Sequence, residues 1–242
     1  MSKYILITGG TKGIGKSVAR ELAASGYQLI LTYGSDRDAA LESQKELKFK
    51  SDVEVELIQA DISSHRSVDV IDSFLKDKNI KLFAVIFNAG ITSRVRFEDI
   101  DAADWEKVFY ANVHFPVFLM QRLLPDMETG GNIVFTGSLM GEYPHSVSLA
   151  YGVTKAAVHA LVKNMVKFAA PYRIRINAVA PGFVDTEWQK TKPTAIRKNI
   201  ENKIALERFC DPDELAEIYK MVVENSYLNG EIITVSGGYS YQ

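Results

Sequence analysis

The sequence predicts an α/β fold: a single-domain, Rossmann-type, doubly wound parallel sheet of about seven strands with helices on both faces. Short apolar runs alternate with helical patterns along all 242 residues. The runs are continuously apolar, which is typical of strands buried on both faces of a sheet. Strand–helix alternation favours parallel crossovers. Because no repeat, low-complexity tract or linker interrupts the pattern, we expect one domain over residues 1–242.

Seven apolar runs are predicted to form the strands: residues 4–8, 28–33, 53–59, 82–88, 132–136, 173–179 and 231–235. A helix is predicted after the first strand, because Ile14, Val18 and Leu22 share one face and Gly26 can end it. A later helix is predicted to begin at Asp211-Pro-Asp-Glu214, which combines a capping residue, an early proline and an acid three positions on.

Composition excludes several classes of function. The formal net charge of −2 gives no electrostatic reason to expect nucleic acid or a membrane surface as partner. No apolar run approaches the roughly 18 residues that span a bilayer, and the first residues lack the apolar region of a signal peptide. Cys210 is the single cysteine and the four histidines share no ligand spacing, so we predict no metal site. These observations predict a soluble cytoplasmic protein.

A glycine-rich loop, TGGTKGIG at residues 8–15, follows the first predicted strand. Gly9, Gly13 and Gly15 have the spacing G-x-x-x-G-x-G. Bare glycines let the backbone approach a pyrophosphate, and the N-terminus of the following helix offers free N–H groups. The loop therefore indicates a dinucleotide site, although an ordinary tight turn between strand and helix has the same composition.

The residues after the second strand bear on which dinucleotide binds. That strand ends at Tyr33 without the acidic residue that binds the ribose 2′-hydroxyl of NAD. Lys12 would attract a 2′-phosphate, with Ser35 and Arg37 nearby to accept it. Asp36 lies close to the position of a ribose-binding acid, and we interpret it as the start of the next helix. The hypothesis is that NADP(H) is preferred over NAD.

Further motifs follow in a fixed order. They are Asp61-Ile62 after the third strand, Asn88-Ala89-Gly90 after the fourth, Asn112 in a long helix, Ser138 after the fifth strand, Tyr151-x-x-x-Lys155, and Pro181-Gly182 and Thr186 after the sixth strand. This order resembles the short-chain dehydrogenase/reductase family over nearly the whole chain. The segments NAGIT, NAVAPGFVDT and ERFCDPDELAE are most similar to the 3-oxoacyl-acyl-carrier-protein reductases of that family.

The resemblance implies a catalytic tetrad of Ser138, Tyr151, Lys155 and Asn112. The glycine loop and the resemblance together give the predicted NADP(H)-binding set: Gly9, Thr11, Lys12, Gly13, Ile14, Gly15, Tyr33, Ser35, Asp61, Ile62, Asn88, Ala89, Gly90, Tyr151, Lys155, Pro181, Gly182, Val184 and Thr186. Taken singly, Ser138 and Thr186 also suit capping positions, and Asn112 also suits a helix interior. Their order and spacing relative to Tyr151 and Lys155 favour the catalytic and cofactor-binding roles over these structural ones.

The spacing of Tyr151 and Lys155 has a chemical meaning in a cleft. A free phenol has a pKa near 10. A unit positive charge about 4 Å away contributes roughly 4 kcal/mol at an effective dielectric constant of 20, on the order of three pKa units. A solvent-exposed pair one helical turn apart would gain only a few tenths of a kcal/mol. We therefore predict that Lys155 lowers the pKa of Tyr151, which then protonates the oxygen of a ketone.

The resemblance implies NADPH-dependent reduction of a 3-oxoacyl thioester linked to acyl carrier protein. Two alternatives remain open: a reductase or dehydrogenase of a small free ketone, sugar or steroid alcohol, and a non-catalytic dinucleotide-binding protein. Relatives pair two long helices, here 102–123 and 151–170, in a dimer interface, which implies a homotetramer.

Residues 183–206 are expected to form a lid over the substrate. The segment contains Trp188 and the basic residues Lys190, Lys192, Arg197, Lys198 and Lys203. Typical carrier-protein reductases have basic residues just before the fifth strand, whereas this chain has Asp126-Met127-Glu128-Thr129. A second position that is basic in those reductases, ahead of the sixth strand, is occupied here by Tyr172, although Arg173 is adjacent. Docking of an acidic carrier would then have to use Arg94, Arg96 or the lid.

Overall fold

The computed structural model describes residues 2–144 and 148–239 of the chain. Within them, seven parallel strands form one sheet. They are β1 (Tyr4–Ile7), β2 (Gln28–Tyr33), β3 (Val55–Gln59), β4 (Leu82–Phe87), β5 (Asn132–Thr136), β6 (Arg175–Pro181) and β7 (Ile232–Val235). The strand order is β3-β2-β1-β4-β5-β6-β7. The predicted doubly wound parallel sheet is confirmed, and its order reverses between β1 and β4.

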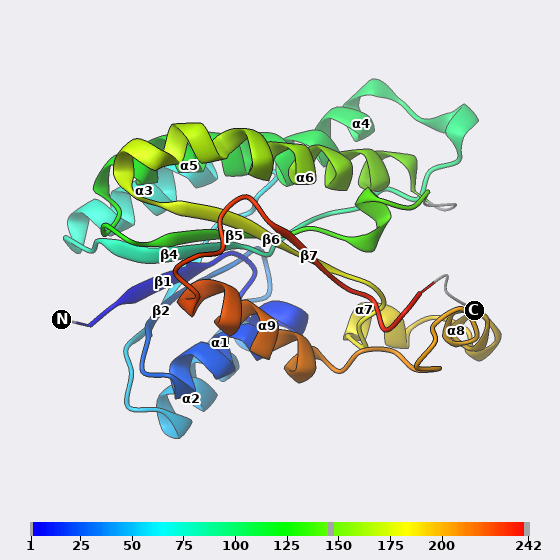
Figure 1. The fold of residues 1–242 in the computed structure, drawn as a ribbon, viewed down its shortest axis with the longest axis horizontal. Coiled ribbons are helices and arrows are strands. Elements are labelled where there is room, and N and C mark those ends of the chain that lie inside the picture. The colour runs from blue at the N-terminus through cyan, green and yellow to red at the C-terminus, as the bar shows by residue number, and fades with distance from the viewer. Residues whose placement is uncertain (1, 145–147, 240–242) are drawn as a thin grey trace.

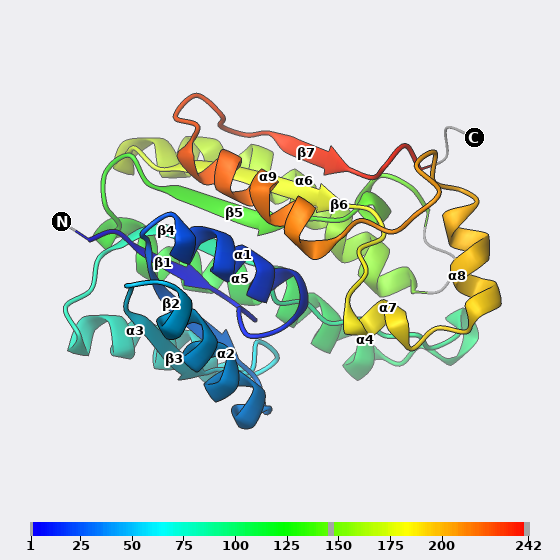
Figure 2. The same cartoon turned by 90° about the horizontal axis from the view of Figure 1, so that it is seen from below.

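Helices cover both faces of the sheet, as Figure 1 shows. One face carries α1 (Gly13–Ala24), α2 (Arg37–Lys50) and α9 (Pro212–Glu224), which lie in front of the strands in Figure 2. The other face carries α3 (Arg66–Asp77), α5 (Phe115–Leu123) and α6 (Leu149–Ala169). The short helices α7 (Glu187–Lys190) and α8 (Thr194–Glu201) lie at one end of the molecule, together with α4 (Ala102–Phe109).

Two apolar cores result from this layering. Ile5 and Ile7 of β1 pack with the face that carries α1 and α9, whereas Leu6 packs with the face that carries α3, α5 and α6. All three side chains are fully buried. Successive residues of a strand point to opposite faces, so a strand with helices on both sides must be apolar throughout. This accounts for the continuously apolar runs in the sequence.

Two strands differ from the predicted boundaries by two residues, and three others by a single residue at one end. β3 begins two residues later than expected, and β6 is displaced by two residues to Arg175–Pro181. The cause at β6 is local. Arg173 has a φ of +58°, in the left-handed region, and ends a short 3₁₀ turn that follows α6. An extended strand can therefore begin only after it.

The predicted long helix over 102–123 is helical throughout but is not uniformly α. A π turn at Tyr110–His114 separates α4 from α5. Such turns insert an extra residue into the helical ladder and occur frequently at functional sites. Here the turn contains Asn112.

The caps of α9 and α1 agree with the sequence. Asp211 accepts a hydrogen bond from the Asp213 N–H at 2.8 Å, and Glu214 accepts the Asp211 N–H at 2.8 Å. The bond to Glu214, together with one from the Glu214 N–H to the Asp211 side chain, forms the predicted capping box. Gly26 follows α1 with a φ of +85°, which suits glycine.

The other end of α9 is capped by a residue that the sequence did not identify. The Arg175 guanidinium of β6 donates to the carbonyl oxygens of Val222 at 3.3 Å, Val223 at 2.9 Å and Leu228 at 3.2 Å. The last carbonyls of a helix have no intrahelical partner. Arg175 therefore joins the end of α9 to the sheet.

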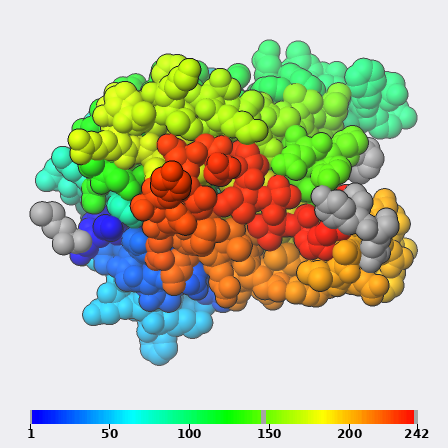
Figure 3. All heavy atoms as spheres, viewed as in Figure 1, coloured from blue at the N-terminus to red at the C-terminus, as the bar shows by residue number. Residues whose placement is uncertain are grey.

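The segment between β6 and α9 is tied to the body at both ends. Cys210 exchanges backbone hydrogen bonds with Phe183 and Asp185, each at 2.9 Å. Further along, Leu206 N donates to Gly237 O at 3.1 Å, beyond β7. Figure 3 shows the β7 region, in red, at the surface between α6 and α9. Among the described residues, no helix combines the length and apolar character required to cross a bilayer.

Candidate active site

The glycine loop lies at the carboxyl end of β1, where the strand order reverses. Gly9 and Gly13 have φ values of +62° and +52°, which a residue with a side chain rarely adopts. A Cβ on Gly15 would lie 2.3 Å from the Gly9 carbonyl oxygen. The loop can therefore fold tightly into α1 only with glycine at these positions.

The N-terminus of α1 fits an anionic group. Lys12 occupies the capping position without a side-chain cap, and the first turn contains no acidic residue. The first N–H groups of a helix lack intrahelical partners and carry the positive end of its dipole. A Cβ on Gly13 would lie 3.4 Å from the Thr186 methyl group, so the loop faces the segment after β6. Thr11 and Ile14 flank this turn, and the donor set suits the predicted pyrophosphate.

Lys12 is paired in a way that the sequence did not reveal. Its ammonium forms an ion pair with Asp36, and this hydrogen bond lowers the pKa of the Asp36 carboxyl. Asp36 also accepts the Ala39 N–H at 3.1 Å and caps α2, as interpreted from the sequence. Tyr33 is half-buried and Ser35 is exposed at the end of β2. A phosphate at this position would share Lys12 with Asp36.

Thr8 joins β1 to β4 at the reversal, although we did not select it from the sequence. Its Oγ1 accepts the N–H groups of Asn88 at 3.0 Å and Ala89 at 3.1 Å. The Asn88 amide in turn donates to the carbonyls of Thr8 at 3.1 Å and Gly9 at 3.2 Å. Its position as the polar last residue of an apolar run was the available signal.

Two other predicted groups lie at carboxyl ends of strands. Asp61, exposed after β3, accepts the backbone N–H of Ser63 at 2.9 Å, and the adjacent Ile62 is buried. After β6, Val184 forms an isolated bridge with Cys210. Pro181 ends β6, Gly182 donates its N–H to Val235 at 2.8 Å, and Thr186 precedes α7.

Asn112 is fixed at the π turn. Its amide nitrogen donates to the Ile91 carbonyl at 2.9 Å and to Thr154 Oγ1 at 3.0 Å, while its Oδ1 accepts the Ile91 N–H at 2.9 Å. Both amide hydrogens are therefore used. A Cβ on Gly90 would lie 3.3 Å from Asn112 Oδ1 and 3.6 Å from Lys155 Nζ, so Gly90 leaves the space between them open. The predicted water-positioning role of Asn112 stays a prediction.

Lys155 is buried inside the site. Its Nζ donates to the Thr136 carbonyl at the end of β5, at 2.6 Å. Only 4% of the residue is exposed, and burial lowers its pKa to about 8. The Nζ lies 5.5 Å from the centre of the Tyr151 ring. The two side chains thus lie together in the protein interior.

The environment of Tyr151 corrects one expectation. Burial raises the pKa of the phenol, and a hydrogen bond with Ser138 acts in the opposite direction. The predicted lowering by Lys155 is therefore wrong for this structure. The reason is that burial penalises both charged groups, which leaves Lys155 less completely protonated than an exposed lysine.

Ser138 is held by a histidine that the sequence analysis assigned no role. The Ser138 N–H donates to His159 Nε2 at 3.4 Å, and Ser138 Oγ accepts the Met140 N–H at 3.1 Å. A Cβ on Gly137 would lie 2.5 Å from Nε2, and one on Gly141 would lie 2.8 Å from Cε1 of the same ring. Burial lowers the His159 pKa, which favours the neutral acceptor. Its position two helical turns after Tyr151 was the only signal.

The structure thus brings Ser138, Tyr151, Lys155 and Asn112 together, next to Gly90. The glycine loop lies at the carboxyl end of β1, close to Thr186. The predicted roles of these residues stay predictions.

Comparisons with known proteins agree with this geometry. Residues 3–197 match the family described as short chain dehydrogenase. An uncharacterized oxidoreductase of Bacillus subtilis, YmfI, is 35% identical, with 99% of each chain covered. The 3-oxoacyl-[acyl-carrier-protein] reductase FabG of Aquifex aeolicus is 30% identical, over 98% of this chain and 96% of that protein.

A solved structure of a short chain dehydrogenase from Burkholderia cenocepacia, in complex with NADP, is 26% identical. It superposes with a TM-score of 0.91 and covers 98% of this chain and 97% of its own. Sequence and fold agree over nearly the full length in both kinds of comparison. The chain therefore belongs to the short chain dehydrogenase family and is an oxidoreductase.

Proposed function

We propose that this protein reduces 3-oxoacyl thioesters to 3-hydroxyacyl thioesters with NADPH. The observation that carries the proposal is the cluster of Ser138, Tyr151 and Lys155, next to Gly90 at the carboxyl end of β4. Such ends are where open α/β sheets bind their ligands. A relative named as a 3-oxoacyl-[acyl-carrier-protein] reductase supports the substrate class.

The residues around the glycine loop support NADP(H) as the cofactor. The uncapped N-terminus of α1 suits the pyrophosphate, and Lys12 with Ser35 suits a 2′-phosphate. Lys155 keeps hydrogens beyond its bond to Thr136 and can also bind the nicotinamide ribose. The solved Burkholderia relative contains NADP.

The chain's side chains supply the proton and the orientation of the ketone. When bound, NADPH supplies the hydride that reduces the carbonyl carbon. Tyr151 donates its phenolic proton to the carbonyl oxygen. Ser138, whose side chain forms a hydrogen bond with Tyr151 in the free protein, would redirect its hydroxyl hydrogen to the same oxygen and stabilise its developing charge. The raised pKa of Tyr151 keeps the phenol protonated before transfer.

Substrate screening tests the substrate class. Initial rates with NADPH are measured for an acetoacetyl thioester on acyl carrier protein, its coenzyme A analogue and simple ketones. The proposal expects the thioesters to have the highest kcat/KM. Faster reduction of a simple ketone would favour the free-ketone alternative, and no turnover of any ketone would favour a non-catalytic binding protein.

Replacement of the proposed proton donor tests the mechanism. Tyr151→Phe removes the transferable proton but keeps the ring, so we expect kcat to fall roughly 100-fold or more while the Kd for NADPH is retained. Near-normal turnover in this variant would contradict the mechanism.

A comparison of cofactors tests the choice of NADP(H). We expect a higher kcat/KM with NADPH than with NADH, and a smaller difference in Lys12→Ala. Because Asp36 competes for Lys12, Asp36→Asn serves as the opposite variant and should increase the preference. Equal values for the two cofactors in the native protein would contradict the choice.

A further inference from the structure

Trp188 of the predicted lid, residues 183–206, contacts both Tyr151, the proposed proton donor, and the cationic side chain of Arg94. Trp188 of α7 packs edge-on against Tyr151, with ring centres 6.4 Å apart. The Arg94 guanidinium, from the loop after β4, lies 5.9 Å from the centre of the same Trp188 ring. Two short ring contacts therefore connect the phenol to a positive charge.

Two lid cations lie close enough to affect each other. Lys192 Nζ lies 5.6 Å from the centre of the Phe183 ring, and Arg197 Cζ lies 4.3 Å from that of Phe209. These two phenylalanine rings pack edge-on at 5.8 Å. Burial lowers the pKa of Lys192, and the charges of Arg94 and Arg197 lower it further. The three cations therefore share one electrostatic environment.

Of the three cations Arg94, Lys192 and Arg197, only Arg197 forms an ion pair with a carboxylate of the described residues. Asp185 pairs with Arg197 at 3.0 Å. In the part of the chain that the structure describes, neither Arg94 nor Lys192 forms an ion pair with a carboxylate. Two neighbouring cations are neutralised by ion pairs. Arg96 and Lys190 each pair with an acidic residue three positions away, at 2.9 Å.

Lys192 and Arg197 are partly buried, whereas Arg94 is exposed. Like charges that lie close together are costly unless an anion joins them, and partial burial of two of them adds to the cost. Arginine also binds carboxylate and phosphate groups in a bidentate manner. Cation–π contacts hold each of the three side chains against an aromatic ring, and so they limit the entropy lost when an anion binds.

We propose that Arg94, Lys192 and Arg197 form an anion-binding subsite that holds a phosphate or carboxylate of the substrate, beyond its reacting carbonyl. The inference rests on the proposed ketone reduction and narrows its substrates to anionic ketones. A phosphate would come from the pantetheine carrier of a thioester, whereas a carboxylate would come from a free keto acid. None of the three residues belongs to the predicted NADP(H)-binding set.

Matched substrate pairs test the subsite. Acetoacetyl-coenzyme A is compared with the uncharged N-acetylcysteamine thioester of the same acyl group, and 4-oxopentanoate with its methyl ester. The native protein should prefer the charged member of one pair. Preference in the first pair identifies phosphate as the group bound, and preference in the second identifies carboxylate.

The variants Lys192→Met and Arg94→Met then connect this preference to the cluster. We expect kcat/KM for the preferred charged ketone to fall at least tenfold, mainly through KM, while the uncharged partner changes less than twofold. Lys198→Met, at an exposed lid lysine, is the matched control and should retain the preference. Equal losses for both members of the pair, or no preference in the native protein, would overturn the subsite.

A readout without turnover separates this inference from the proposed function. The chain contains two tryptophans, so Trp105→Phe leaves Trp188 as the only one. Quenching of Trp188 fluorescence is measured with iodide, an anion, and with neutral acrylamide, and Lys192→Met should reduce quenching by iodide but not by acrylamide. Equal quenching before and after this substitution would overturn the subsite. Absence of ketone turnover with intact iodide selectivity would overturn the proposed function instead.

Discussion

Burial acts on both members of the pair formed by Tyr151 and Lys155. It raises the pKa of the phenol and lowers that of the ammonium to about 8. Each group is thus shifted towards its neutral form, which for Tyr151 is the form that donates a proton. Burial of the Lys155 charge therefore lowers the free energy of unfolding of the chain.

Lys155→Met is therefore expected to stabilise the chain at pH 7. A pKa that falls from 10.5 to about 8 on folding corresponds to at most about 3 kcal/mol of penalty on the charged form. Loss of the hydrogen bond to Thr136 offsets part of the gain. Urea unfolding of both proteins measures the difference.

The pH dependence of this difference has a defined sign. Between pH 8 and 10.5 the unfolded lysine binds more protons than the folded one, so the native protein gains stability as pH rises through this window. The advantage of the Met variant should therefore shrink from pH 8 to 10.5. A constant difference would show that Lys155 is not the titrating group.

His159 is a second residue of the site whose role can be tested, through its hydrogen bond with the Ser138 N–H. His159→Leu removes the acceptor of the Ser138 N–H, and we expect kcat to fall about tenfold, on the order of one hydrogen bond. KM for NADPH should not change. His159→Gln supplies an oxygen acceptor of similar reach and should restore most of kcat. Equal activities of the Leu and Gln variants, at equal Tm, would contradict a positioning role.

The sequence predicted which side chains gather but not how they are held. Ser138, Tyr151 and Lys155 could be found because their order and spacing along the chain resemble those of the short-chain dehydrogenase/reductase family. His159 and Thr8 could not, because their bonds to Ser138, Asn88 and Ala89 depend on tertiary contacts. The same holds for the ion pair of Lys12 with Asp36, 24 residues away.

The elements were predicted more completely than their ends. Apolar runs and capping residues are local signals, so the capping box at Asp211 was found from sequence alone. The start of β6 was missed because it depends on the left-handed conformation of Arg173, a non-glycine residue. The π turn around Asn112 was missed because a five-residue irregularity leaves the apolar pattern of a long helix almost unchanged.

Arg175 provides a test at the scale of elements. Arg175→Met removes three hydrogen bonds to carbonyls at and beyond the end of α9, and we expect a loss of about 2–4 kcal/mol of unfolding free energy. Arg173→Met is the matched control. It is exposed and should change stability by less than about 0.5 kcal/mol. Similar effects of both substitutions in urea unfolding would contradict the capping role.

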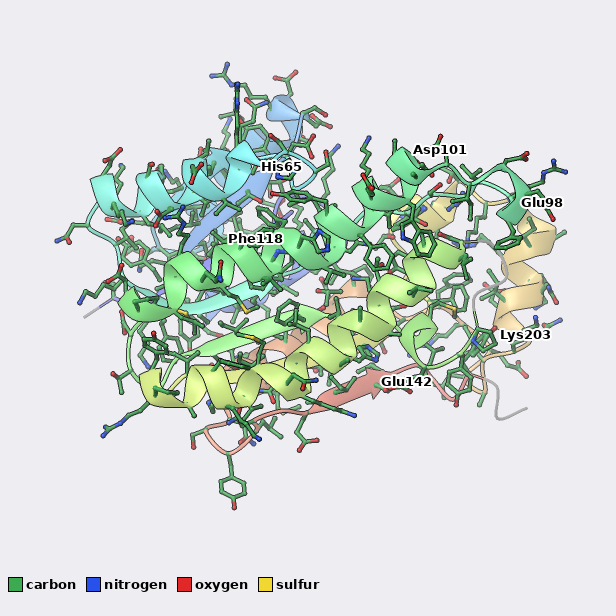
Figure 4. All side chains as sticks on the ribbon, turned by 90° about the horizontal axis from the view of Figure 1, so that it is seen from above. His65, Glu98, Asp101, Phe118, Glu142 and Lys203 are labelled. Carbon is green, nitrogen blue, oxygen red and sulfur yellow. The ribbon has the colours of Figure 1, made fainter. Side chains whose placement is uncertain are left out.

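At the scale of the whole molecule, apolar side chains lie exposed on α5 and α6. They are Phe118, Leu149, Val153 and Phe168. Figure 4 looks onto these two helices, with Phe118 labelled on α5. Exposed apolar groups that gather on one face are typical of a protein interface, which agrees with the predicted pairing of these helices in a homotetramer.

Light scattering tests the tetramer. We expect a mass of about four times the 27.0 kDa of one chain. The double variant Phe118→Glu with Phe168→Glu should give a smaller particle, because burying two carboxylates at an interface is costly. Phe49→Glu is the control, since Phe49 is 90% exposed on α2, on the opposite face of the sheet. A monomeric native protein would contradict the prediction.

The attachment of the lid to the residues after β7 has a consequence during synthesis. Leu206 and Ile204 pair with Gly237 and Tyr239, respectively, so the predicted lid is fastened by residues that leave the ribosome after it. A nascent chain that has already released Tyr151 and Lys155 still lacks this fastening. Since contacts between distant segments form slowly, the predicted lid can be fastened only after the residues that follow β7 have been synthesised.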